Sequence, residues 1–305
     1  MLKLLELKQR IKAVQNIQAI TRTLATVSAA KLSRSRRRAA GLREYTRKMQ
    51  EILFDQQEYL EGKGVSIGTL TPLLKERDVV NRAGLMVITA DRGMCGNYNL
   101  AACRLAHDFW VKRKKASQST VFFTKGRKGE RFFRRRGAEI LYAEGWCREG
   151  VLAEEVERFL SMSLDLFLNG SIDELYAVYT RFYSPLRRLP QVKRLLPVKL
   201  ERAGQRNKKI EKWYYEPSFR EIFDELLAIY LRVQLYDVLL ESFASEHGAR
   251  MITMEEATER AEKTLTEHRV QYNRLRRESI TIDLLGVLFA SKVVEEVKTT
   301  PGEMA

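Results

Sequence analysis

A short stretch near residue 91 combines residue types that could do chemistry: a carboxylate, a guanidinium, a thiol and two glycines. It comprises Asp91, Arg92, Gly93, Met94, Cys95 and Gly96. The stretch follows an apolar run and precedes a helical pattern, and a glycine-bearing turn in that position can hold a phosphate group. It has neither the G-x-G-x-x-G spacing of dinucleotide-binding proteins nor the G-x-x-x-x-G-K-[ST] spacing of P-loops. We therefore interpret it as a structural turn, and a small enzyme that uses this turn stays open as an alternative.

Cysteine and histidine are too sparse to predict a disulfide framework or a structural zinc site. The chain has three cysteines, Cys95, Cys103 and Cys147, without a C-x-x-C spacing, and three histidines. Scattered cysteines in odd number predict free thiols in a reducing compartment. We interpret Cys95 as a small buried apolar residue rather than a reactive thiol. No cofactor and no metal are expected.

Basic residues outnumber acidic ones, 54 Lys and Arg against 39 Asp and Glu, which gives a formal net charge of +15. The densest cluster is Arg34, Arg36, Arg37 and Arg38. Two further basic segments, Lys112–Lys115 and Lys125–Gly137, carry the aromatic pair Phe132 and Phe133. Taken alone, basic segments with aromatic residues suit nucleic acid, because phosphate neutralisation dominates that affinity. Such an aromatic pair is more often the buried face of a helix, so a nucleic-acid-binding protein is kept as an alternative function.

The two ends of the 305-residue chain are predicted to be long helices. Near the N-terminus an apolar stripe recurs at helical spacing, formed by Leu4, Leu7, Ile11 and Val14. After Pro217 no proline occurs before about Lys298, and an apolar ladder with steps of three or four runs from Met254 to Val293. This pattern is typical of a coiled coil, with a possible break near His247-Gly248. The basic first helix and the mildly acidic last one would attract each other as an antiparallel pair.

Strands and helices alternate in the middle of the chain. Strands are predicted at Gly84–Ala90, Ser119–Gly126, Ala138–Glu144, Ile172–Pro185 and Gln191–Leu200, with helices at about Leu100–Lys115, within Lys125–Gly137 and at Val151–Leu168. This alternation predicts parallel βαβ units covered by helices on both faces. The expected fold is α/β, with a long antiparallel coiled coil of the terminal helices and a central Rossmann-like domain. The expected domains are residues 1–60, 80–205 and 215–298.

No segment is predicted to target or cross a membrane. The opening residues MLKLLELKQRIK carry charges every two or three positions, unlike a secretory signal. No apolar run approaches the roughly 20 residues of a membrane helix. Any membrane association is therefore expected to pass through a partner.

Three segments together resemble one known family. LKQRIKAVQNIQAITRTLATVSAAKL (residues 7–32) resembles the opening helix of the gamma subunit of F-type ATP synthases. TADRGMCGNYN (89–99) resembles its strand–turn motif, usually SDRGLCGGLN, and residues 235–284 resemble its C-terminal helix. The segments occur in the family's order, and they cover roughly a third of the chain directly.

The resemblance implies a rotor shaft with no active site of its own. In that family the terminal helices form an antiparallel coiled coil inside the hexamer of alpha and beta subunits. The central domain sits near the epsilon subunit and the membrane ring of c subunits, at the cytoplasmic face of the bacterial plasma membrane. It implies that Arg34, Arg36, Arg37 and Arg38, and also Arg277, Thr281 and Asp283, contact the catalytic ring. The resemblance also implies a partner for the basic segments Lys112–Lys115 and Lys125–Gly137, either the polar loops of the ring or anionic lipid headgroups.

The sequence departs from the family's usual pattern at several positions. Ile282 stands where a polar residue is usual, and Asp283 where the usual residue is Glu. Thr26 replaces a usual Met, and Asn97 a usual glycine. These departures suggest a divergent member, of the kind encoded in a second, alternative synthase operon.

Overall fold

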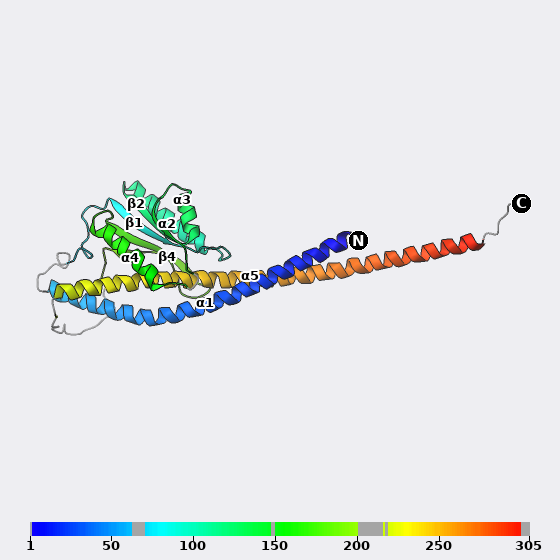
Figure 1. Ribbon diagram of the computed structural model, residues 1–305, viewed down its shortest axis with the longest axis horizontal. Coiled ribbons are helices and arrows are strands. Elements are labelled where there is room, and N and C mark those ends of the chain that lie inside the picture. Colours follow the sequence, from blue (N-terminus) through cyan, green and yellow to red (C-terminus); the bar gives the residue numbers. More distant parts are fainter. Residues whose placement is uncertain (1, 63–70, 148–149, 201–215, 217–218, 300–305) are drawn as a thin grey trace. The chain divides into compact units, whose positions relative to one another are not determined.

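The computed structural model describes residues 2–62, 71–147, 150–200, 216 and 219–299. Two helices are very long, α1 (Leu2–Glu61) and α5 (Phe219–Thr299). Between them lie β1 (Arg82–Ile88), α2 (Tyr98–Lys115), β2 (Ser119–Lys125), α3 (Arg127–Arg134), β3 (Glu139–Glu144), α4 (Ala153–Leu168), β4 (Glu174–Phe182) and β5 (Arg188–Leu196). The predicted architecture, two long terminal helices with an α/β domain between them in the sequence, is confirmed (Figure 1).

The chain divides into two compact units. Unit 1 consists of Met1–Ala25 with Met254–Ala305, and unit 2 of Thr26–Thr253. Unit 2 therefore holds the central sheet together with the adjoining lengths of α1 and α5. The predicted domain limits at residues 205 and 215 lie outside the described residues.

The sheet has the strand order β3-β2-β1-β4-β5. The first four strands are parallel, but β5 pairs antiparallel with β4. The prediction of parallel units is thus wrong for the last strand. Only residues 183–187 separate β4 from β5, whereas a parallel connection needs a dozen or more residues. Pro190 lies within β5, as expected for a strand at a sheet edge.

Helices cover both faces of the sheet within unit 2. One apolar cluster joins α2 and α3 to the sheet through Cys103, Phe122 and Phe133. A larger cluster on the other face joins α4 to the sheet and to both long helices, with Leu53 on α1 and Leu239 on α5. Figure 1 shows α2 and α3 on the side of the sheet turned away from α5. The strands β1 and β2 are buried almost throughout, which explains their near-continuous apolar sequence.

The two long helices pair within each unit. In unit 2, Ser35 Oγ donates a hydrogen bond to the carbonyl of Leu240 at 3.2 Å. In unit 1, the hydroxyls of Thr21 and Thr258 lie 2.8 Å apart. The α5 helix continues through Gly248, so the predicted break is wrong. A Cβ at that position would lie 3.1 Å from the Phe182 ring, so the glycine permits close packing rather than a bend.

Candidate functional site

The turn between β1 and α2 is held by its own aspartate. The carboxylate of Asp91 accepts hydrogen bonds from the backbone N–H groups of Arg127 and Trp146, each at 2.9 Å. Arg127 opens α3, where backbone N–H groups lack helical partners. Both oxygens of Asp91 are thus engaged in fixing the neighbouring loops, which is a structural role.

The thiol of the turn lies inside the protein. Cys95 is 1% exposed, and its sulfur accepts a hydrogen bond from Asn99 Nδ2 at 3.1 Å. The other end of that amide accepts the N–H of Ala90 at 2.8 Å. Burial raises the pKa of the Cys95 thiol, which disfavours the reactive thiolate. The interpretation of Cys95 as a small buried residue is confirmed.

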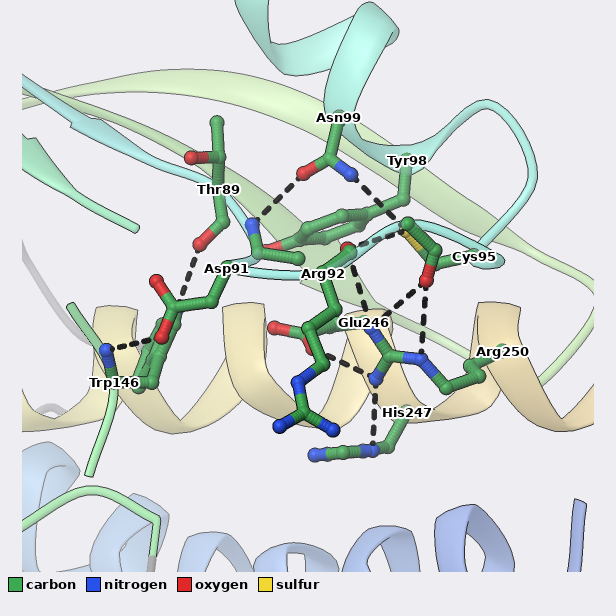
Figure 2. A network of polar contacts seen from close by, with 12 residues as sticks. Thr89, Asp91, Arg92, Cys95, Tyr98, Asn99, Trp146, Glu246, His247 and Arg250 are labelled. Atoms are coloured by element: carbon green, nitrogen blue, oxygen red, sulfur yellow. Dashed lines mark hydrogen bonds and ion pairs between the residues drawn. The ribbon is translucent and has the colours of Figure 1, made fainter. Parts of the chain in front are cut away.

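The turn meets α5 in a polar cluster whose side chains on α2 and α5 are buried, and we name it the turn–α5 junction (Figure 2). Its members are Arg92, Gly93, Tyr98, Ser242, Glu246 and Arg250. The Arg250 guanidinium forms an ion pair with Glu246 at 2.7 Å and lies 3.4–3.5 Å from the carbonyl oxygens of Gly93 and Arg92. The hydroxyls of Tyr98 and Ser242 lie 3.0 Å apart. A phosphate cradle would present converging N–H groups, whereas here two carbonyl oxygens of the turn face a cation.

Burial shifts two titratable side chains, Glu246 in the junction and His247 beside it, toward their neutral forms. Burial, assisted by the positive charges of Arg250 and Lys31, lowers the pKa of His247 to about 3. The imidazole is therefore neutral at physiological pH. Burial raises the pKa of Glu246, and the adjacent Arg250 opposes that shift. The arrangement connects the turn and α2 to α5. In this junction no nucleophilic side chain lies beside a base.

The predicted arginine cluster lies on the surface of α1. Arg34, Arg36, Arg37 and Arg38 are all exposed, while Ser35 between them is buried against α5. The guanidinium of Arg36 lies 5.8 Å from the centre of the Phe182 ring. A cavity of about 320 Å³ is lined by Arg36, Ala39, Ala40, Arg181, Phe182, Tyr183, Glu241 and Ala244. The structure thus adds Arg181 and Tyr183, from near the end of β4, to the predicted cluster.

The second predicted group lies on the far part of α5, in unit 1. Arg277, Thr281 and Asp283 are exposed, and Thr281 Oγ1 donates to the carbonyl of Arg277 at 3.0 Å. They are surrounded by exposed apolar side chains, a set that sequence reasoning missed: Ile280, Ile282, Leu284, Leu285, Val287, Leu288 and Phe289. We name this set the apolar end of α5. Its signal in the sequence is that apolar residues occupy every side of the helix rather than one stripe.

The remaining basic segments belong to α2 and α3 and to the residues just after α3, on one side of the sheet, and we name their exposed basic residues the α2–α3 basic face. Its exposed members are Lys112, Lys114, Lys115, Arg127, Lys128, Arg131, Arg134, Arg135 and Arg136. The aromatic pair is not available for stacking on bases. Phe133 is fully buried against Phe122, with ring centroids 4.6 Å apart, and Arg136 lies 3.6 Å over the Phe132 ring. The geometry therefore gives no support to the nucleic-acid alternative.

The described part of the chain contains no helix with the length and apolar character needed to cross a bilayer. Within the same residues, no three His, Cys, Asp or Glu side chains are grouped as ligands for a metal ion.

Comparisons with known proteins agree over nearly the whole length. A family model described as ATP synthase matches residues 3–291. The ATP synthase gamma chain of Moorella thermoacetica is 36% identical over 287 residues, which cover 93% of this chain and 96% of that protein. The gamma chain of Geobacter metallireducens is 32% identical over 302 residues, covering 97% of this chain and 100% of that one.

Solved structures show the same fold. A chain of the Euglena gracilis mitochondrial ATP synthase, in a structure of OSCP, F1 and the c-ring, matches with a TM-score of 0.62 at 13% identity, covering 99% of this chain and 98% of that one. A chain from the central stalk and c-ring of the Tetrahymena thermophila mitochondrial enzyme gives a TM-score of 0.57 at 20% identity, covering 78% of this chain and 99% of that one.

Proposed function

Because the chain belongs to the gamma-chain family of ATP synthases, we propose a set of contacts through which it works. The chain is a non-catalytic rotor subunit of the central stalk of a rotary ATP synthase, and a peripheral part of that complex. It couples ion flow through the membrane ring to ATP synthesis or hydrolysis in the alpha–beta hexamer. The observation that carries the proposed contacts is the apolar end of α5, which the described part of the chain leaves uncovered.

We propose that the apolar end of α5 is enclosed by the alpha and beta subunits. Ile282, Val287 and Phe289 are each more than two-thirds exposed, at 68%, 68% and 67%. Large apolar side chains gathered at one end of a helix mark a protein interface. Arg277, Thr281 and Asp283 then supply polar contacts at the rim of the same surface.

Rotation of an asymmetric shaft explains how such contacts drive catalysis elsewhere. A partner can shift a conformational equilibrium only through contacts that differ between the conformations. A shaft built from one α1 and one α5 presents a different face to each catalytic subunit at each angle. Turning it therefore favours open and closed catalytic sites in sequence.

We propose that Arg34, Arg36, Arg37 and Arg38 contact acidic loops of the catalytic subunits. Their exposure, and the cavity beside Arg36, supply a cationic surface complementary to carboxylates. Arginine is suited to this because its planar fork binds a carboxylate through two parallel hydrogen bonds.

The experiment that tests this contact replaces all four arginines with glutamine in the assembled, membrane-bound enzyme. We expect ATP-driven ion pumping to fall relative to ATP hydrolysis. A matched control carries the same loss of charge on the α2–α3 basic face, as Arg127→Gln, Lys128→Gln, Arg131→Gln and Arg135→Gln. Unchanged coupling in the first variant, or an equal loss in both, would contradict the proposed contact.

We further propose that the central domain binds the epsilon subunit and the ring of c subunits. The β4–β5 hairpin and the edge strand β5 expose Tyr183, Leu186, Leu189 and Val192, with Leu186 81% exposed. In a binding assay with purified epsilon, Leu186→Arg with Leu189→Arg should weaken binding. Val79→Arg, at a site that is 66% exposed, serves as the control. Unaltered binding by the double variant would exclude this surface.

We propose the cytoplasmic face of a bacterial plasma membrane as the location. The absence of a membrane-crossing helix among the described residues and the bacterial sources of the similar gamma chains support it. Fractionation should place the chain with membranes when the ring is present, and release it together with the alpha and beta subunits.

A further inference from the structure

We infer that the turn–α5 junction is the place where torque passes between the central domain and the helix pair, with Arg250 as its positioning residue. The inference rests on the proposed rotor function. The residues that form the junction come from the turn after β1, from α2 and from α5, and all of them belong to unit 2.

The junction uses directional contacts where packing alone would be expected. Arg250 and Glu246 are 8% and 6% exposed, and the guanidinium pairs with Oε1 of the carboxylate, whose Oε2 is buried without a hydrogen-bond partner among the described residues. One guanidinium links the carboxylate of α5 to two carbonyls of the turn. Apolar contact is non-directional and tolerates sliding, whereas a hydrogen bond weakens steeply when its angle or length changes. Such a cluster resists displacement of the turn along α5.

A second set of polar contacts lies beside it on the same helix. Ser245 Oγ donates to the carbonyl of Thr180 at 2.9 Å, and Ser242 Oγ accepts the N–H of Thr180 at 3.3 Å. Both serines are fully buried. Ser245 and Glu246 follow Ser242 by three and four residues, so both lie on the same side of α5 as Ser242. That side of α5 therefore contacts both β4 and the turn that follows its neighbouring strand β1, which joins the sheet to α5 at two places.

A buried ion pair such as Arg250–Glu246 is weak evidence for a role in stability. Replacing both members of such a pair by apolar residues of similar volume is often neutral or stabilising, whereas removing one member leaves an uncompensated buried charge. A double apolar replacement consequently separates a role in stability from a role in holding the turn against α5. It can keep the fold while removing the directional contact.

The test uses membrane vesicles and compares the wild-type enzyme with a double variant that carries both Glu246→Leu and Arg250→Met. The isolated subunit should keep an unfolding temperature close to that of the wild type. The assembled complex should keep ATP hydrolysis, while ion pumping per ATP hydrolysed falls several-fold as the opposing gradient grows. A pair that serves stability alone would lower the amount of complex without changing that ratio.

The matched control is a half-buried ion pair elsewhere in the same unit, Arg113–Glu174, at 2.5 Å between α2 and β4, which does not involve α5. Arg113→Met with Glu174→Leu should leave the pumping ratio unchanged. If the junction double variant does not fold, Tyr98→Phe and Ser245→Ala, which each delete one hydroxyl, are measured for the same ratio. A wild-type ratio in folded junction variants, or an equal loss in the control, would overturn the inference. Failure of the wild-type chain to assemble or pump would instead refute the proposed function.

Discussion

Single residues of the turn show how reactive residue types can serve structure. Asp91 fixes two backbone N–H groups, Cys95 is buried, and Arg92 and Gly93 contribute carbonyl oxygens to the junction. The sequence allowed the turn to be predicted, because it lies between an apolar run and a helical pattern. It could not reveal Glu246 and Arg250 as partners, because they lie more than 150 residues further along and no local pattern marks them.

Thiol chemistry offers a direct test of the buried turn. Burial raises the pKa of Cys95, and it raises that of Cys103 to about 12, whereas Cys147 is half-buried. Because the thiolate is the reacting species, we expect a maleimide at pH 8 to modify Cys147 first. Peptide mapping by mass spectrometry would identify the site, and Cys147→Ser should abolish the fast phase. Rapid modification of Cys95 in the folded subunit would contradict the structure.

The lowered pKa of His247 predicts that the free energy of unfolding depends on pH in the acid range. Its folded pKa of about 3 lies below the ordinary value of 6.5, so between these values the unfolded chain binds a proton that the folded chain does not. The free energy of unfolding therefore falls as the pH falls through this window, by at most about 1.4 kcal/mol per pH unit from this one group. The raised pKa of Glu246 acts in the opposite direction.

The variant His247→Asn isolates that contribution. Asparagine keeps an acceptor near Arg250 Nη1, which lies 3.3 Å from His247 Nδ1, but it does not titrate. Urea unfolding between pH 7 and pH 4 should give a flatter pH profile for the variant than for the wild type. Parallel profiles would show that His247 is not held neutral in the folded protein.

The helices and strands were more predictable from the sequence than the way in which they pair and pack. The absence of proline after Pro217 was enough to predict a long helix, and α5 is one. The direction of β5 was not predictable from the pattern of apolar residues. That pattern is the same whether the chain enters the strand through a hairpin or through a crossover connection. The local sequence predicts a possible break at Gly248, because the packing of this glycine against Phe182 is a tertiary contact that the local sequence does not contain.

The α2–α3 basic face predicts binding to anionic lipid headgroups. Seven of its members, Lys112, Lys114, Lys115, Arg127, Lys128, Arg131 and Arg135, have no ion-pair partner among the residues that the structure describes. A base near an anionic surface contributes roughly 1 kcal/mol. Replacing Lys114, Lys115, Arg131 and Arg135 with glutamine should therefore weaken sedimentation with phosphatidylglycerol vesicles more than about tenfold.

The control for that measurement is the glutamine replacement of Arg34, Arg36, Arg37 and Arg38, which removes the same charge from α1. It should weaken vesicle binding much less, and neither variant should bind phosphatidylcholine vesicles. Equal losses would mean that only the net charge of +15 matters, and the α2–α3 basic face would have no special role.

At the scale of the whole molecule, the two units differ in how much of each long helix is packed. In unit 2, every residue of α5 from Leu239 to Arg250 is buried, whereas in unit 1 residues 280–292 are exposed. Helical hydrogen bonds without packing open easily. We expect amides of residues 280–292 to exchange with deuterium far faster than those of 239–250 in the isolated subunit. Assembly with alpha and beta subunits should slow the first group, and uniform slow exchange without them would contradict the uncovered apolar end.

The general plan of the molecule was predictable because three levels of the sequence agree: helical periodicity at the ends, alternating strands and helices in the middle, and one glycine-bearing turn. The apolar end of α5 was misassigned to the coiled-coil ladder, because Ile282 and Phe289 continue its spacing although they are exposed. Spacing predicts which residues share a face, and it does not say whether a partner from the same chain covers that face.

Pairing between the two ends of the sequence has a consequence for biosynthesis. Ser35 meets Leu240 across 205 positions, and Thr21 meets Thr258 across 237. At roughly 5–20 residues per second, a ribosome needs about 10–40 s to make the first of these partners. Throughout that interval the nascent α1 presents Leu32, Met49 and Leu53 to the surrounding medium without the helix that later buries them. The pairing of α1 with α5 can therefore be completed only after translation has passed Thr258.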